Sequence, residues 1–276
     1  MACIERLSQY IEELVGARQW RPISTYRGGP KISHLLFADD IILFAEDTEE
    51  QARVIKRCLN TFCEASGQKL STSKSKVLFS PNTLGYQVDT ICNILEMTST
   101  NDLGKYLGVP TINGRVTRNK FQYVLDRIER KFAGWKTKCL SLVGHVTLIQ
   151  STIQAIPAYT MQTMKLPRSI CDKVDRKTRC FMWGGTAHER KPHLVQWDIV
   201  TRPKSQGGLG LQSMRQLNST CLSKQGWKIL EEEESLWTRV LKNKYGRRRY
   251  DLDIFQAKPG YSLLWKGVTE NNHVIQ

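Results

Sequence analysis

The stretch SHLLFADDIILFAED, residues 33–47, decides how the chain folds around it. Two adjacent carboxylates, Asp39 and Asp40, interrupt an otherwise apolar run. A charge inside an apolar environment is costly unless it is paired or binds a metal. Apolar residues on both sides of the pair leave no room for the polar face of an amphipathic helix. The pattern therefore predicts a strand, a tight turn carrying the two acids, and a second strand.

Acids at such a turn leave the core for a surface that can hold a metal ion. Mg²⁺ prefers carboxylate oxygens and keeps several of its waters. Two such ions can bridge the attacking and leaving oxygens in phosphoryl transfer, provided that rigid elements carry the carboxylates. The alternative is a turn whose two acids are simply solvated, and on spacing alone both interpretations stay open.

The whole chain is strongly basic, with 276 residues and a formal net charge of +15. Residues 101–200 hold 17 Lys and Arg against 7 Asp and Glu, a net charge of +10. Such a field favours a polyanionic partner such as nucleic acid, although an ordinary basic protein has the same composition. No apolar run reaches the length of a membrane span, and no secretory leader opens the chain. We therefore expect an intracellular protein without a membrane partner, in the nucleus or the cytoplasm.

Metal sites built on cysteine or histidine are not expected. The eight cysteines show no CxxC spacing and are spread through amphipathic stretches, which is typical of reduced, mostly buried thiols. His188 and His193 are too far apart to bind one ion from consecutive turns of a helix, and Pro192 would break that helix.

Helical periodicity and helix-ending residues predict the main elements. Residues 3–15 read as a helix, and Thr48 reads as the N-cap of a second helix that ends at Gly67. Residues 69–80 read as a loop and a strand, residues 81–104 show the least pattern, and residues 106–110 read as a short strand closed by Pro110. Further helices are predicted from Arg118, from Leu142 to Ala155 with a stop at Pro157, and from Pro167 to Met182. These elements predict an α+β fold whose later part is mainly helical.

The hairpin sequence resembles the F/Y-x-D-D box of reverse transcriptases, and other motifs of that family follow in order. SGQKLSTSKSKVLFS (66–80) resembles the loop and strand after the palm helix, and KYLGVP (105–110) resembles the strand that grips the primer end. FAGWKTKCLSLVGHVTLIQSTIQAIPAY (132–159) resembles the thumb helices of plant LINE-type elements, which are retrotransposons without long terminal repeats. HLVQWDIVTRPKSQGGLGL (193–211) and SLLWKG (262–267) resemble the connection that follows. The resemblance implies a partial polymerase palm at 1–110, a thumb at 111–185 and a connection at 186–276.

The resemblance also implies roles for single residues. Asp39 would be a Mg²⁺ ligand, and Asp40 would support the site and bind the ion weakly. Lys74 would donate a proton to the departing pyrophosphate, but a solvated loop lysine is an equal alternative, because the Asn common just before it in the family is absent here. The primer end would be positioned by Tyr106, Leu107 and Gly108, of which the first two read equally well as core residues.

Two basic helix faces would hold the backbone of the RNA template and DNA primer, mostly without reading sequence. The alternative is that they are ordinary solvated faces. These residues are Arg127, Arg130, Lys131, Lys136, Lys138, Lys173, Arg176, Lys177 and Arg179.

Relative to the family pattern, the fingers and the strand with the first catalytic Asp are missing upstream of Asp39. Two metal ions need more carboxylates than this pair, so we expect weak or absent Mg²⁺ binding and no primer extension by the chain alone. An upstream fingers-palm fragment is the expected partner, and an apolar patch along the hairpin is expected to favour association. The alternative function is a non-catalytic RNA- or DNA-binding module derived from the polymerase.

Overall fold

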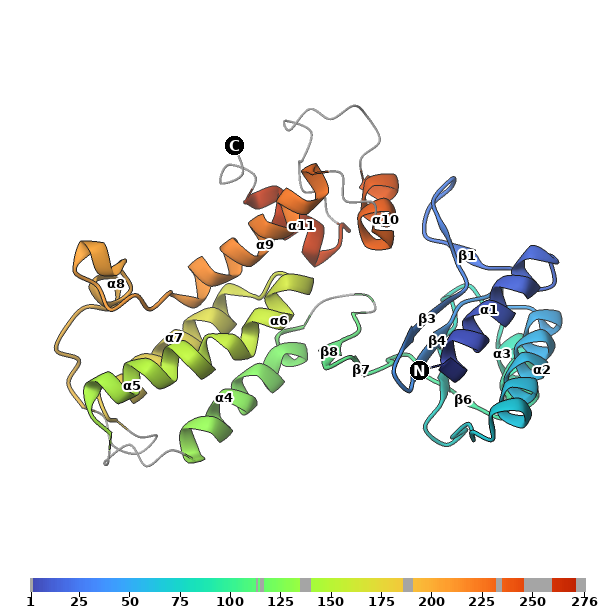
Figure 1. Ribbon diagram of the computed structural model, residues 1–276, viewed down its shortest axis with the longest axis horizontal. Helices are drawn as coiled ribbons and strands as arrows, with labels where there is room; N and C mark the ends of the chain where they lie inside the picture. Colours follow the sequence, from blue (N-terminus) through green and yellow to red (C-terminus); the bar gives the residue numbers. More distant parts are fainter. Residues whose placement is uncertain are drawn as a thin grey trace. The chain divides into compact units, whose positions relative to one another are not determined.

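The computed structural model describes residues 2–112, 114, 117–134, 140–185, 191–231, 235–245 and 260–271. The chain divides into two compact units, Met1–Gly114 with Ser235–Arg247, and Arg115–Glu234 with Arg248–Gln276. Helices predominate, and the strands of the described part are short and paired two by two (Figure 1), which confirms the α+β prediction. The division into palm, thumb and connection at residues 110 and 185 stays a prediction.

The first unit is built around two helices and the apolar cluster between them. Helix α1 (Ala2–Gly16) packs against α2 (Glu49–Ser66) and against strand β3 (His34–Phe37). Thr48 caps α2 by accepting a hydrogen bond from the Gln51 N–H, and Gly67 ends it in the left-handed conformation, as predicted. The residues fully buried in this cluster are Leu7, Ile11, Trp20, Val54 and Cys58.

Another helix of the first unit, α3 (Gly85–Leu95), was not predicted from the sequence. It lies within the stretch 81–104, where no pattern was recognised. Leu84 occupies its N-cap position without a side-chain hydrogen bond, so the usual capping residue is missing. The helix is held instead by packing, because Ile91 and Leu95 are buried against Ala52 of α2. The unit also contains α10 (Leu236–Tyr245).

The strands among the described residues of the first unit form four separate pairs. β1 (Ile23–Ser24) pairs with β2 (Lys31–Ile32), and β3 pairs with β4 (Asp40–Leu43), both antiparallel. β5 (Lys76–Val77) and β6 (Thr98–Ser99) are parallel, whereas β7 (Lys105–Tyr106) and β8 (Val109–Pro110) are antiparallel. The prediction that 106–110 forms one strand closed by Pro110 is therefore wrong. The chain turns at Leu107 and Gly108, both with positive φ, and Pro110 pairs with Lys105.

The second unit is a layer of packed helices. It contains η1 (Arg118–Phe121), α4 (Gln122–Gly134), α5 (Leu142–Leu148), the π-helical turn η3 (Ile149–Ile153), α6 (Ala155–Thr163), α7 (Arg168–Met182), α8 (Trp197–Val200), η4 (Lys204–Gln206), α9 (Met214–Leu230) and α11 (Leu263–Glu270). Helix α7 contacts α4 and α9, and α9 also contacts α6 and α11 (Figure 1). The predicted helix from Pro167 to Met182 is confirmed as α7.

Pro157 does not end the helix that begins at Leu142, contrary to the prediction. It is the third residue of α6, which begins two residues after the π-helical turn Ile149–Ile153. Proline has no N–H to donate and its ring crowds the carbonyl four residues earlier, which here belongs to Ile153. A wider turn at that point accommodates both effects, so the chain continues as a helix.

Only two of the described cysteines, Cys58 and Cys171, are buried, whereas the other five are half-buried or exposed, so the expectation of mostly buried thiols is wrong in part. The seven cysteines within the described ranges form no disulfide, and Cys139 lies outside those ranges. Burial raises the pKa of Cys58 to about 11 and that of Cys171 to about 12, so both thiols are protonated and unreactive near neutral pH. None of the helices that the structure describes has the length and apolar character needed to cross a membrane.

Candidate active site

The hairpin of β3 and β4 presents the two aspartates at its tip, as the sequence predicted. Leu36 pairs with Ile41, Phe37 pairs with Asp40, and Ala38 and Asp39 form the two-residue turn. Both aspartates are exposed. Ala38 has φ 52°, a left-handed conformation that costs energy for a residue with a side chain. The tip is thus a tight and strained turn that presents two carboxylates to solvent.

One face of the hairpin is anchored to the core and the other is more open. Residues directly opposite each other on antiparallel strands share a face. Ile41 and Leu43 pack against the buried cluster between α1 and α2, so their partners Leu36 and His34 share that inner face. On the outer face Phe37 is 59% exposed. Leu35 and Ile42, the other pair on that face, are half-buried, so the predicted apolar patch along the hairpin and its effect on association stay predictions.

Hydrogen bonds fix the base of the hairpin. The indole N–H of the buried Trp20 donates to the Phe44 carbonyl at 2.9 Å, and the Phe44 N–H donates to the Ser33 carbonyl at 2.7 Å. The imidazole of His34 lies 2.8 Å from Ser8 Oγ on α1 through Nε2, and 2.9 Å from Ser33 Oγ through Nδ1. Burial lowers the pKa of His34, and the nearby Glu12 opposes that shift. These contacts hold the hairpin against α1.

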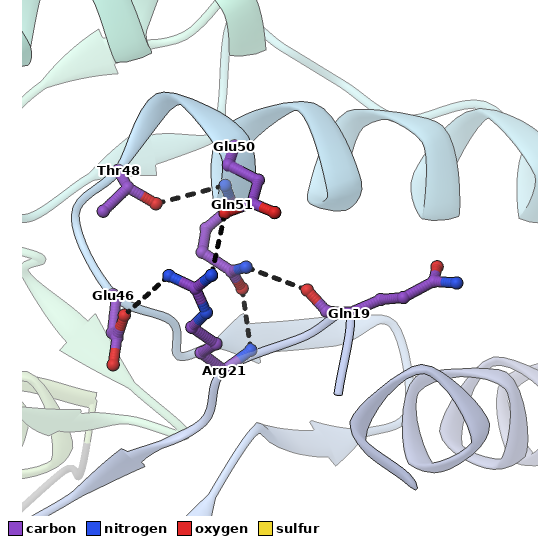
Figure 2. Close-up of polar contacts among 6 residues, drawn as sticks. All are labelled: Gln19, Arg21, Glu46, Thr48, Glu50 and Gln51. Atoms are coloured by element: carbon purple, nitrogen blue, oxygen red, sulfur yellow. Dashed lines mark hydrogen bonds and ion pairs between the residues drawn. The ribbon is translucent and has the colours of Figure 1, made fainter. Parts of the chain in front are cut away.

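A buried amide fixes the point where the hairpin leads into α2. Gln51 is fully buried; its Nε2 donates to the Gln19 carbonyl at 2.8 Å, and its Oε1 accepts from the Arg21 N–H at 2.8 Å (Figure 2). The Arg21 guanidinium in turn contacts Glu46 at 3.5 Å and Glu50 at 2.9 Å on the exposed side (Figure 2). Exposed ion pairs of this kind contribute little, whereas a buried amide with both partners is costly to remove.

Sequence reasoning missed the roles of Gln51 and Trp20. No motif in the sequence marks Gln51, which lies in the first turn of α2. The available signal was its position three residues before Val54 and seven before Cys58, on the stripe that becomes the buried face of the helix. A polar side chain on such a stripe must find hydrogen-bonding partners.

The other residues of the first unit with a predicted role lie on segments whose strands do not pair with the β3–β4 hairpin. Lys74 is exposed in the turn before β5, Tyr106 is half-buried at the end of β7, and Leu107 and Gly108 form the turn to β8. Among the described residues, no ladder hydrogen bonds join β5 or β7 to the β3–β4 hairpin. Strand pairing therefore does not connect these residues with the hairpin, and the roles assigned to them stay predictions.

Helix α4 shows the predicted separation of apolar and basic faces. Val124, Leu125 and Ile128 are buried, whereas the basic side chains on the opposite side are exposed. The basic residues are Arg127, Arg130 and Lys131. Two further residues assigned to this face, Lys136 and Lys138, lie outside the described residues.

Helix α7 also carries its basic residues away from its buried side, but their charges are not equally available. Lys173 and Arg176 are exposed. Lys177 forms an ion pair with Glu129 of α4 at 2.7 Å, so its charge is partly compensated. Arg179 is half-buried, and its Nε has no hydrogen-bonding partner in the part of the chain that the structure describes.

The chemistry available at the hairpin tip is that of two neighbouring carboxylates. They suit a hard divalent cation that keeps most of its waters. Across the described ranges, no three His, Cys, Asp or Glu side chains gather into a metal-binding group. Within the described ranges, Asp39 and Asp40 are therefore a pair of carboxylates without a third protein ligand beside them.

Comparisons with known proteins point to plant proteins. No family model matches the chain. It is 39% identical over 162 residues, 58% of its length, to "Putative ribonuclease H protein At1g65750" of Arabidopsis thaliana, of which the match covers 26%. It is also 29% identical over 123 residues, 44% of its length, to "Uncharacterized mitochondrial protein AtMg00310" of the same plant, of which the match covers 79%. The chain thus spans about a quarter of the first of these relatives.

Proposed function

We propose that the chain derives from a plant retroelement and is part of an RNA-directed DNA polymerase, a reverse transcriptase of the LINE type. The observation that carries the proposal is the β3–β4 hairpin, which presents Asp39 and Asp40 at a tight turn on an anchored base. The similarity to a plant protein named for ribonuclease H gives support, since reverse transcription requires removal of the RNA strand from its product.

The residues at the tip fit a role in metal-assisted phosphoryl transfer. In the complete enzyme Asp39 would ligate Mg²⁺, and Asp40, at the first position of β4, would support it. When bound, the metal would stabilise the charge that develops on the transferred phosphoryl group. The hydrogen bonds of Trp20 and Gln51 would keep the carboxylates in place, because they fix where the hairpin leaves the core.

The remaining predicted residues would act on the nucleic acid. Lys74 would protonate the departing pyrophosphate, and the turn at Leu107 and Gly108 would contact the primer end. The exposed basic residues of α4 and α7 would contact the phosphates of the RNA template and DNA primer. Contacts of this kind depend on salt and little on sequence.

Reconstitution tests the catalytic proposal. The purified chain is mixed with a separately produced fingers-palm fragment of a LINE-type polymerase, and extension of a DNA primer on an RNA template is measured with and without Mg²⁺. We expect Mg²⁺-dependent extension by the mixture, none by the chain alone, and loss of extension on Asp39→Asn. Glu64→Gln, an exposed acid on α2, is the matched control. Extension that survives Asp39→Asn would refute the proposed role.

A non-catalytic RNA- or DNA-binding module is the second candidate function. It is favoured by the two-carboxylate site, since the described residues bring no further metal-ligating side chain to the pair. This function predicts an affinity for RNA or DNA that falls steeply with salt and is unchanged by Asp39→Ala. Loss of affinity in Asp39→Ala would instead connect binding to the hairpin tip.

A further inference from the structure

A hollow of about 410 Å³ opens in the second unit where α7 faces the starts of α8 and α9. Four charged residues of α7 lie along it at a spacing that places them on one side of the helix: Asp172, Asp175, Arg176 and Arg179. Trp197 and Asp198 of α8 line it, as do Ser213 and Arg215 at the start of α9.

Two of the acids in this hollow already have partners. Asp172 binds Arg215 in a bidentate pair, with Oδ1 to Nε and Oδ2 to Nη2 both at 2.7 Å. Asp175 Oδ1 accepts the N–H of Met214, the first residue of α9, at 3.0 Å. The charges of Asp172 and Arg215 therefore compensate each other, and the N–H of Met214 at the start of α9 has its acceptor.

Two arginines of the hollow have no acidic partner within the part of the chain that the structure describes. Neither Arg176 nor Arg179 forms an ion pair with any residue of the described ranges, although Asp172 lies close enough to Arg176 to feel its charge. Arg176 is exposed, so its guanidinium is free to reach a ligand. Two guanidinium groups on one wall of a pocket are suited to the paired oxygens of a phosphate.

We propose that this hollow binds a phosphate group through Arg176 and Arg179, with room beside the phosphate for the group esterified to it. The proposal deepens the suggested contact of α7 with nucleic acid and rests on that function for the source of the phosphate. Binding of the oxyanion itself does not depend on the polymerase proposal, because it needs only residues of the second unit.

Protonation of Asp175 would regulate this binding. Burial raises the pKa of Asp175 to about 6, opposed mainly by the Met214 N–H. The other charged groups around it are Asp172, Arg176 and Arg179 on α7, Asp198 on α8, and Arg215 on α9. Cys171 stays a neutral thiol, with its pKa at about 12. Loss of the negative charge of Asp175 below pH 6 removes a repulsion from the anion, so affinity rises as the pH falls.

Dimethyl phosphate is the probe for the test, because it carries one negative charge throughout this pH range. Binding to the full chain is followed by NMR, through the indole N–H of Trp197 and the Nε–H of Arg179. We expect both signals to shift and the affinity to be about three- to tenfold higher at pH 5.5 than at pH 7.5. Asp175→Asn keeps the acceptor for Met214, and we expect it to give the higher affinity at both pH values.

Variants and a second ligand complete the test. Arg176→Gln with Arg179→Gln should weaken binding about tenfold or more, whereas Lys224→Gln, an exposed lysine of α9 outside the hollow, should not. Unchanged binding in the double variant, or no shift of either signal, overturns the site. Inorganic phosphate and a single-stranded oligonucleotide then separate the sources of the phosphate.

Each outcome with the oligonucleotide decides between the two proposals. An oligonucleotide that shifts the same two signals supports both the site and the nucleic-acid function. If dimethyl phosphate and inorganic phosphate bind but the oligonucleotide does not, the oxyanion site stands and the nucleic-acid function fails. If the oligonucleotide binds with no effect of the double variant, the hollow is refuted as its site while the proposed function stands.

Discussion

Replacing Gln51 by leucine tests whether its amide holds the hairpin to the rest of the first unit. The substitution removes two hydrogen bonds of 2.8 Å, to the Gln19 carbonyl and from the Arg21 N–H. Leucine fills similar space but leaves both backbone groups unpaired beside a fully buried side chain. At about 1–2 kcal/mol for each group, we expect Gln51→Leu to lower the free energy of unfolding of the first unit by about 2–4 kcal/mol.

Hydrogen exchange followed by mass spectrometry measures this loss of stability in the hairpin and in α2. Peptides covering residues 33–59 report on the hairpin and α2 together, and the Phe44 amide, bonded to the Ser33 carbonyl, is the key position. Glu50→Gln is the matched control, because it removes only an exposed ion pair to Arg21 and should cost less than about 1 kcal/mol. If Gln51→Leu costs no more than this control, or leaves exchange at Phe44 unchanged, the amide does not anchor the hairpin.

For three further substitutions, the structure predicts whether stability rises or falls. Ala38→Gly relieves the left-handed backbone at φ 52° and should raise stability by up to about 1 kcal/mol in urea unfolding, whereas Ala65→Gly, in α2, should lower it by a similar amount. Asp175→Asn should stabilise the second unit by about 1–2 kcal/mol at pH 7.5, after allowance for solvent screening, and not at all below pH 4. Folding raises the pKa of Asp175 from 3.8 to about 6, so the folded state is favoured while Asp175 is protonated, and this contribution to stability is lost as the pH rises from about 4 to about 6. If Asp175→Asn changed the free energy of unfolding equally at pH 7.5 and below pH 4, burial of the charged carboxylate would not be the cause. Ser213→Ala removes the capping box with Gln216 and should cost about 1 kcal/mol, seen as faster exchange in the first turn of α9; unchanged exchange there would argue against the cap.

Local patterns in the sequence were sufficient for the elements that local chemistry controls. The hairpin followed from an apolar run interrupted by two acids, and both ends of α2 followed from Thr48 and Gly67. The amphipathic helices α4 and α7 followed from their spacing of apolar residues. In each case the signal and the structure that it specifies lie within a few residues of each other.

The elements that sequence reasoning missed depend on contacts distant in the chain. Helix α3 lacks a capping side chain and is held by burial of Ile91 and Leu95 against α2. The π-helical turn before Pro157 is the exception, because its cause is local: a wider turn lets a helix continue where proline usually ends one. Gln51 joins residues about thirty positions away, which no local pattern indicates. Tertiary packing overrides local preference at α3 and at Gln51.

The same limit applies to the candidate site. Adjacent aspartates at a turn were predictable because both the turn and the acids are local. The hydrogen bonds that fix the base of the hairpin, from Trp20 to Phe44 and from His34 to Ser8, join segments more than twenty residues apart. The hollow between α7, α8 and α9 likewise requires the packed helices.

The most direct test of the hairpin as a metal site uses Mn²⁺ as a paramagnetic substitute for Mg²⁺. Even weak binding broadens the NMR signals of amides close to the ion. We predict broadening centred on residues 37–41, reversed by excess Mg²⁺ and lost in Asp39→Asn. Broadening centred elsewhere, or unchanged by Asp39→Asn, would contradict metal binding by the paired aspartates.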